Sequence, residues 1–484
     1  MPVGTIALVG HLRRVRRLDW TCTPLEVVAA WPSDEPLVYL HSARPHPRWA
    51  RWSILSSPLG SLRFSGRSVV SGRLGGRMSI QLTQDPMADL DRVLAADVGA
   101  WKACHDGDPP FLGGFIGYLS YDLGGSLEPK AGGRARGGRA GHDRGWPLLE
   151  LAYCPGALVY DNLSCVWYAV GDPPSLPCPT PEADHRIGGG ETGVFHTGVL
   201  KSNVEPDRYL AMIARAKEYI AAGDIFQANI THRFSASFTG STRALAARAL
   251  AASGAWYGAY LELPGGRCAV SLSPELFLAA DLAAGSVVTR PVKGTRPSRT
   301  APDELLGSAK DTAELNMIVD LMRNDLGRVC QYGSVRVPRP RVIETHPTVH
   351  HGVAEVTGML RPDVSVGDLL RATFPGGSIT GAPKIRAMQI IDELEPHRRG
   401  PYCGAIGYIS CGCMQLNIAI RTIVLTGRRP RGVWDQLTGT LDYGVGGGIV
   451  ADSDPPAEYR ETLDKAEIIR LVLGQSRQPT AVIQ

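Results

Sequence analysis

No stretch of this chain approaches the roughly 18 consecutive apolar residues that a membrane-spanning helix needs. The chain has 484 residues, of which 44% are hydrophobic, so it can bury a substantial core. Its apolar N-terminal stretch comes before its first basic residues, the reverse of a secretory signal. We therefore predict a soluble, cytoplasmic protein that does not associate with a membrane.

Charge and cysteine content make other classes of protein improbable. The net charge of +4 is small for this length and predicts no acidic partner. The ten cysteines lie far apart, and the one close pair, Cys411 and Cys413, lacks a second pair, so reduced thiols are favoured over zinc. The basic stretch 130–139 is similar to RNA-binding segments but is short and has no interleaved aromatic residues. We predict a solvated loop there and no nucleic-acid partner.

Composition also indicates how the chain is organised. Residues 171–190 are rich in proline and glycine and predict a flexible connector. Short β-type runs come before it, and alternating strand and helix patterns follow it. We predict an N-terminal region, 1–195, a second region, 196–475, and a short tail, 476–484.

Lys293 is a candidate nucleophile. The preceding run, Gly285–Arg290, is rich in β-branched residues and predicts a strand, and Gly294 supplies a turn that could hold the amine toward a cavity. Most lysines are solvated, and only a desolvated or cation-flanked amine is nucleophilic at neutral pH. Residues elsewhere in the chain must therefore decide the role of Lys293.

Charged residues near the C-terminus form one such set. Asp454 suits a helix N-cap, and Pro455 suits the first helical position. In the helix that follows, Glu458, Glu461 and Lys465 share one face. A solvated face with ion pairs is the alternative interpretation.

A third carboxylate lies in the helix pattern Lys310–Gly327, which ends at a glycine. Its Glu314 could join Glu458 and Glu461 as an oxygen ligand for Mg²⁺, a hard ion that takes a few carboxylates and keeps sites for water and substrate. Sequence spacing alone does not establish that the three converge.

Two glycine-rich stretches complete the set of motifs. Gly444–Val450 would let backbone amides approach an anion, with a tight turn that binds nothing as the alternative. Gly376–Lys384 has the glycine spacing of a phosphate-binding loop, but Ala382 and Pro383 stand where Lys and Ser/Thr are needed. We predict no phosphate-binding loop there.

The motifs resemble, in their order, those of the chorismate-utilising enzymes. This family contains the large subunits of anthranilate synthase and aminodeoxychorismate synthase, with isochorismate and salicylate synthases as relatives. The resemblance covers about residues 205–475, and the first 195 residues match only loosely, chiefly at Phe111–Tyr118. The motifs that carry it are Ser273–Glu275, Pro291–Pro297, the helix of Glu314, His350–His351, Gly376–Lys384, Tyr402–Tyr408, Ile420–Thr422, the glycine run and the final Glu/Glu/Lys helix.

The resemblance implies an α+β fold in which two large, mainly antiparallel β-sheets pack as a sandwich with helices outside, as in anthranilate synthase component I. It also implies that the N-terminal region, 1–195, shares its core with a chorismate-binding catalytic region, 196–475. A lysine in the PxKGT motif is similar to aminodeoxychorismate synthase component I, where anthranilate synthases usually carry alanine. The implied reaction is Mg²⁺-dependent. It converts chorismate and ammonia to 4-amino-4-deoxychorismate through a covalent lysine intermediate, for para-aminobenzoate and folate synthesis.

A separate glutaminase subunit would supply the ammonia. The alternatives to this activity are an anthranilate synthase component I and a non-catalytic binding protein of the same family.

The resemblance also implies roles for particular residues. Lys293 would be the nucleophile, Glu275 a general acid whose pKa burial should raise, and His351 an active-site histidine. His351 is preferred to His350 by its offset to Val356–Gly358, with a structural imidazole as the alternative. Mg²⁺ would be held by Glu314, Glu458 and Glu461. The residues implied to bind substrate are Thr295, Ser378, Tyr402, Arg421, Gly447, Gly448 and Lys465.

Overall fold

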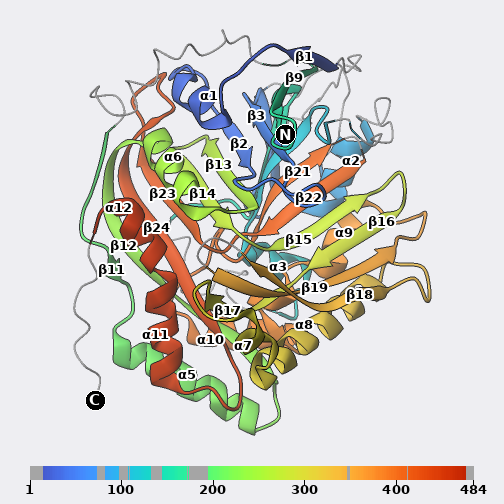
Figure 1. Cartoon of the computed structure of the whole chain (residues 1–484), viewed down its shortest axis with the longest axis vertical. Coiled ribbons are helices and arrows are strands. Elements are labelled where there is room, and N and C mark those ends of the chain that lie inside the picture. The colour runs from blue at the N-terminus through green and yellow to red at the C-terminus, as the bar shows by residue number, and fades with distance from the viewer. Residues whose placement is uncertain are drawn as a thin grey trace.

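The computed structural model describes residues 15–72, 82–96, 107, 109–131, 144–171, 173, 194–345, 349–410 and 412–475 (Figure 1). Most of the basic stretch 130–139, most of the connector and the whole tail 476–484 lie outside these residues. No helix in the described part of the chain has both the length and the apolar character needed to cross a membrane.

The described strands form two large antiparallel sheets, which confirms the predicted fold class. The first has thirteen strands, and its two longest, β12 and β24 near one edge, pair in continuous register from Ala228 opposite Ile449 to Ser241 opposite Gln436. Its spatial order is β1 (Val15–Leu18), β9 (Val166–Gly171), β8 (Gly156–Asp161), β3 (Trp52–Ser56), β2 (Val38–His41), β13 (Tyr257–Leu263), β14 (Arg267–Ser273), β23 (Thr422–Arg428), β24 (Gln436–Ile449), β12 (Gln227–Ser241) and β10 (Phe195–Thr197), with β11 (Lys201–Ser202) and β20 (Gly381–Ala382) also paired to β12.

The second sheet has eleven strands and carries Lys293 on its edge strand, β17. Its spatial order is β17 (Val292–Pro297), β19 (Val349–Met359), β16 (Ser286–Arg290), β15 (Leu276–Asp281), β22 (Cys413–Ile418), β21 (Ala405–Ser410), β6 (Gly114–Leu119), β7 (Leu149–Cys154), β4 (Gly60–Phe64) and β5 (Ser68–Gly72), with β18 (Arg336–Thr345) paired to β19. The strand predicted from the β-branched run is therefore present as β16.

Strands from the N-terminal part of the chain extend both sheets. In the first sheet β2 pairs with β13, placing Tyr39 opposite Tyr260. In the second sheet β6 pairs with β21, placing Gly117 opposite Gly407. Backbone hydrogen bonds of both sheets thus join segments that lie far apart in the sequence.

Helices cover the outer faces of the sheets (Figure 1). The two that concern the site are α8, which packs on β17 and β18, and α11, which runs along β24. The helices are α1 (Pro24–Ala30), α2 (Pro86–Ala96), α3 (Gly124–Leu127), α5 (Pro206–Ala221), α6 (Thr242–Ser253), α7 (Pro302–Leu306), α8 (Ala309–Gly327), α9 (Val366–Thr373), α10 (Lys384–Leu394), α11 (Pro455–Lys465) and α12 (Glu467–Leu473), with 3₁₀ turns η2 (Tyr121–Leu123) and η6 (Gly377–Ile379).

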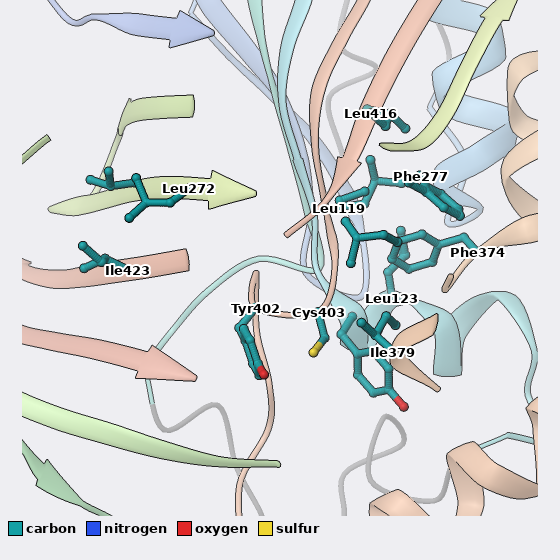
Figure 2. Close-up of a cluster of buried hydrophobic side chains, with 14 of the residues drawn as sticks. Leu119, Leu123, Leu272, Phe277, Phe374, Ile379, Tyr402, Cys403, Leu416 and Ile423 are labelled. Carbon is teal, nitrogen blue, oxygen red and sulfur yellow. The ribbon is translucent and has the colours of Figure 1, made fainter. Parts of the chain in front are cut away.

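One hydrophobic cluster takes side chains from both sheets. In Figure 2, Leu272 and Ile423 of the first sheet lie on one side of the cluster and Phe277 and Leu416 of the second sheet lie on the other, and each of these four is at most 1% exposed. Full burial of one such side chain contributes about 1.5–3 kcal/mol. This shared core fixes the first sheet relative to the second, and with it the two halves of the site described below.

The lysine of the Gly376–Lys384 motif makes a buried ion pair. Lys384 Nζ lies 2.6 Å from Asp325 Oδ2 near the end of α8, and it donates to the Thr373 carbonyl at the end of α9 over 2.8 Å. Burial lowers the pKa of Lys384 and raises that of Asp325, so desolvation outweighs the attraction at both partners. The lysine of this motif, at the start of α10, therefore joins the ends of α8 and α9.

Removing one member of this pair should be costly, because the other charge would stay buried without a partner. We expect Asp325→Ala to lower the free energy of unfolding by about 3–5 kcal/mol. The double variant Asp325→Ala/Lys384→Met should recover most of that loss. Urea unfolding followed by circular dichroism measures both. A single variant that loses less than about 1 kcal/mol would show that the pair does not hold the helices.

Candidate functional site

Lys293 lies where the edge strand of the second sheet meets β24 of the first. It pairs with Gly352 of β19, and a Cβ atom at Gly448 of β24 would lie 3.1 Å from Lys293 Nζ. Gly294 does not form the turn that the sequence predicts. It has φ +79° inside β17, where the register shifts between Lys293 and Thr295. A bulge of this kind re-aims the neighbouring side chain, and glycine accepts the backbone angle at little cost.

Gln227, the first residue of β12, faces the same point and was missed by the sequence analysis. Its Nε2 and Cδ would lie 3.2 Å from a Cβ atom at Gly448. The residue is 0% exposed, and neither polar atom of its amide has a hydrogen-bond partner among the described residues. An unsatisfied buried amide costs about 1–3 kcal/mol, so this arrangement is typical of a group that awaits a ligand or water.

Glu275, between β14 and β15, lies close to Lys293. It is 4% exposed, and the Val292 amide donates to its Oε1 over 3.4 Å. Burial raises the pKa of Glu275 to about 7, against opposing effects of the Ser378 hydroxyl and the Lys293 ammonium. The expected burial and raised pKa are both found. The structure thus brings Glu275, Lys293 and Ser378 together.

The three predicted metal ligands gather from two helices. Glu314 lies on α8, and Glu458 and Glu461 lie on α11, whose N-cap Asp454 accepts from the Ala457 amide as the sequence predicts. Burial raises the pKa of Glu314, partly offset by the two nearby ammonium groups of Lys293 and Lys310.

The pKa of Glu461 is lowered, chiefly by Lys465, whose Nζ lies 2.6 Å from Glu461 Oε1 and 2.8 Å from the Gly446 carbonyl. Lys293 and Lys310 lower it further. Glu461 and Lys465 therefore form an ion pair at the edge of the group that surrounds Lys293 and Lys310.

Lys310 lies among these carboxylates and was not singled out by the sequence analysis. Its Nζ is 3.4 Å from Glu458 Oε1 and 3.9 Å from Glu314 Oε1. Within the described residues, no three His, Cys, Asp or Glu side chains are gathered closely enough to hold a metal ion. The carboxylates fit Mg²⁺ by donor type, since all supply oxygen, but they are spaced around an ammonium group.

The two adjacent histidines have different surroundings. His350 is fully engaged, with Nδ1 3.0 Å from Thr345 Oγ1 and Nε2 donating to the Thr300 carbonyl over 3.1 Å. His351 is 3% exposed, and its Nδ1 lies 3.0 Å from Thr295 Oγ1, two residues after Lys293. Both histidines lie opposite β17 in the sheet, and His351 is the one whose side chain contacts that strand.

Arg421 and Tyr402 lie near the first sheet. Arg421 precedes β23 with φ +50°, which non-glycine residues rarely adopt. Its guanidinium makes no ion pair or hydrogen bond within the described part of the chain, and burial lowers its pKa. Tyr402 is 8% exposed, and any Cβ at Gly444 would fall 2.2 Å from its ring. No described contact joins either residue to Lys293.

The glycine run is part of a strand and not a tight turn. Gly446, Gly447 and Gly448 pair in register with β12. A Cβ atom placed on Gly447 would lie 3.1 Å from Glu458 Oε2. A Cβ atom placed on Gly448 would lie 3.1 Å from Lys293 Nζ. Because these residues lack side chains, α11 carboxylates and the β17 amine can both approach the strand closely. Periodicity misses the strand because glycine carries no apolar pattern.

Comparison with known proteins gives the family. Residues 74–470 match the model of the chorismate binding enzymes. Aminodeoxychorismate synthase component 1 of Escherichia coli is 36% identical over 93% of this chain and 98% of its own length. The Salmonella typhimurium protein of the same name is 41% identical over 75% of this chain and 77% of its own length. The chain belongs to the chorismate-binding enzyme family, as its motifs predict.

Relatives with another activity are nearly as similar. Anthranilate synthase component 1 of Thermus thermophilus is 34% identical over 92% of this chain and 94% of its own length. The crystal structure of anthranilate synthase component I from Streptococcus pneumoniae superposes with a TM-score of 0.70 at 28% identity, covering 92% of this chain and 97% of that one. This chain thus shares its fold with a solved anthranilate synthase component I.

Proposed function

We propose that this chain aminates chorismate to 4-amino-4-deoxychorismate, the activity for which its Escherichia coli and Salmonella relatives are named. One observation carries the proposal. Lys293 Nζ lies in a largely buried group with the carboxyl of Glu275 and the unsatisfied amide of Gln227. A primary amine beside an acid that is half protonated near neutral pH is suited to displace a hydroxyl group covalently.

The first step follows from these two residues. The Lys293 amine forms a bond to ring carbon 2 of chorismate, the two ring double bonds shift from C1=C2 and C5=C6 to C1=C6 and C4=C5, and the C4–O bond breaks. Glu275 donates the proton that leaves with the hydroxyl as water, and the proton lost by the Lys293 nitrogen restores the Glu275 acid. The product of this step is chorismate joined to Lys293 less one water.

In the second step ammonia attacks carbon 4, both ring double bonds shift back, and the C2–N bond to Lys293 breaks. A proton from the incoming ammonia passes to the departing amine. The Gln227 amide lies beside Lys293 Nζ, where its oxygen can accept a hydrogen bond from an amine and its nitrogen can donate one to the ring substituents. The enzyme is regenerated with Lys293 free.

Glu314, Glu458 and Glu461 would hold Mg²⁺ in this proposal. When bound, the cation offsets the repulsion between the ring carboxylate of chorismate and these side chains and polarises the ring as a Lewis acid. The substrate would be oriented by the side chains of Thr295, Ser378 and Lys465 and by backbone groups of Gly447 and Gly448. His351, held by Thr295, would face the departing hydroxyl.

Arg421 is proposed to bind a substrate carboxylate, because a partly buried guanidinium with no ion pair among the described residues is the group that an incoming anion would satisfy. We expect Arg421→Met to raise KM for chorismate about 10- to 100-fold. The same change should leave the ligand-free protein at least as stable as wild type, because it removes a partly buried charge that has no ion pair in the described part of the chain.

Steady-state kinetics and thermal unfolding measure the two effects, with Arg428→Met, at the exposed end of β23, as the control. An unchanged KM together with a less stable protein would assign Arg421 to the structure alone.

Ammonia is proposed to come from a separate glutaminase subunit, as the component 1 names of the relatives imply. Purified chain supplied with ammonium ion should therefore turn over without glutamine. Glutamine should replace ammonia only when the partner is added.

The test of the proposed function is the identity of the product. Chromatography and mass spectrometry after incubation with chorismate, Mg²⁺ and ammonia should show 4-amino-4-deoxychorismate, which keeps its pyruvyl ether, with no pyruvate released. The Thermus thermophilus relative favours anthranilate synthase as the second candidate, and that activity would release pyruvate and form anthranilate. No turnover, even with a glutaminase partner, would favour a non-catalytic chorismate-binding protein.

A further inference from the structure

Lys310 occupies the space between the two helices that supply the carboxylates. It lies one helical turn before Glu314 on α8, and its Nζ reaches across to Glu458 on α11. Glu458 cannot follow a departing partner, because its side chain is 6% exposed and its Oε1 accepts a 2.7 Å hydrogen bond from Ser453 Oγ. Lys310 can leave, because its own side chain is 50% exposed.

The distances suit an ammonium and not a metal. Mg²⁺ binds oxygen at about 2.0–2.1 Å, whereas Glu458 Oε1 and Glu314 Oε1 lie 3.4 and 3.9 Å from Lys310 Nζ, too far to bind an ion at the position of that nitrogen. Within the described residues no such close group of carboxylates is present. Two positive charges at short range would also repel, so the ammonium and a divalent cation cannot share this space at low cost.

We propose that Lys310 is the resident counter-cation of this carboxylate cluster, and that a divalent metal binds by displacing its ammonium group into solvent. This inference rests on the proposed function for the assignment of Glu314, Glu458 and Glu461 as metal ligands. In the metal-free protein Lys310 holds α8 against α11 through Glu458. Displacing the ammonium group takes free energy that would otherwise favour metal binding. Lys310 therefore lowers the affinity of the site for the metal.

Binding of Mn²⁺ without chorismate tests the proposal independently of turnover. Titration calorimetry should show that Lys310→Gln binds Mn²⁺ about tenfold more tightly than the wild-type protein, which corresponds to about 1.4 kcal/mol. The metal-free variant should unfold at a lower temperature, because the carboxylates lose their cation, and Mn²⁺ should raise its Tm by more than it raises that of wild type. Lys310→Arg should bind Mn²⁺ as weakly as wild type.

The matched control is Arg323→Gln, which removes a cation from an exposed pair with Asp320 on the same helix. It should change neither Mn²⁺ affinity nor the Mn²⁺-induced shift in Tm. Equal or weaker Mn²⁺ binding by Lys310→Gln would overturn the proposal. If wild type still aminates chorismate in that case, the proposed function stands and only the role of Lys310 falls. Absence of Mn²⁺ binding by every variant would overturn the metal assignment together with this inference.

Discussion

Lys293→Ala should lower kcat/KM for the amination of chorismate by about 10³-fold or more, because the variant lacks the group that forms the covalent bond. Lys310 should not replace it, because the bound metal is proposed to displace the Lys310 ammonium group into solvent. The variant should keep its affinity for chorismate within about tenfold, as measured by ligand-induced change in Tm. Steady-state product formation with ammonia gives the rate.

The control for this change is Lys201→Ala, which removes an exposed amine from β11. It should leave kcat/KM unchanged. Retention of more than about a tenth of wild-type activity by Lys293→Ala would mean that Lys293 only orients the substrate or lowers the pKa of its neighbours.

Glu275→Gln should lower kcat about 10²- to 10⁴-fold, the usual range for loss of a general acid. Wild-type activity should also fall tenfold per pH unit above about pH 7, because burial raises the pKa of Glu275 to about 7 and only the protonated form can donate. The residual activity of Glu275→Gln should lack this decline. Rates measured between pH 5.5 and pH 9, about 1.5 to 2 units either side of that pKa, resolve the two profiles.

The same carboxyl makes stability depend on pH. Its pKa in the folded protein, about 7, lies above its ordinary value of 4.5. The stability gained from burying the neutral acid is therefore fully present below about pH 4.5 and is lost as pH rises through about 7. Relative to wild type, Glu275→Gln should become more stable as pH rises across this window. A pH-independent difference in Tm would contradict the raised pKa.

Local sequence patterns are sufficient to place the elements of the site but not to bring them together. The cap at Asp454 and the helical spacing of Glu458 and Glu461 predict α11, because capping and periodicity act within a few residues. Nothing local indicates that β17 of one sheet meets β24 of the other, which brings Lys293 to Gly448. That contact depends on the core shared by both sheets, and the sequence suggests it only through a family resemblance.

Gln227 and Lys310 could not be predicted as site residues from the sequence, for the same physical reason. Gln227 begins a strand and Lys310 follows a helix start, so each has the pattern of an ordinary polar residue at an element end. Their importance comes from their surroundings: an amide with no partner in one case and carboxylates from two helices in the other. The sequence predicts a turn at Gly294 because a glycine after a β-type run usually marks one. In the structure Gly294 has φ +79° but lies inside a strand, and only its pairing across the sheet distinguishes it from a turn glycine.

The central claim is that Lys293 becomes covalently joined to chorismate, and mass spectrometry of the intact protein with chorismate and Mg²⁺, but without ammonia, tests it most directly. We predict a species heavier than the free protein by chorismate less one water, with the added mass on the peptide that contains Lys293. Addition of ammonia should discharge it as 4-amino-4-deoxychorismate. Two results together would contradict the claim. The wild-type protein would form the aminated product although no adduct on Lys293 can be trapped, and Lys293→Ala would form that product at an undiminished rate.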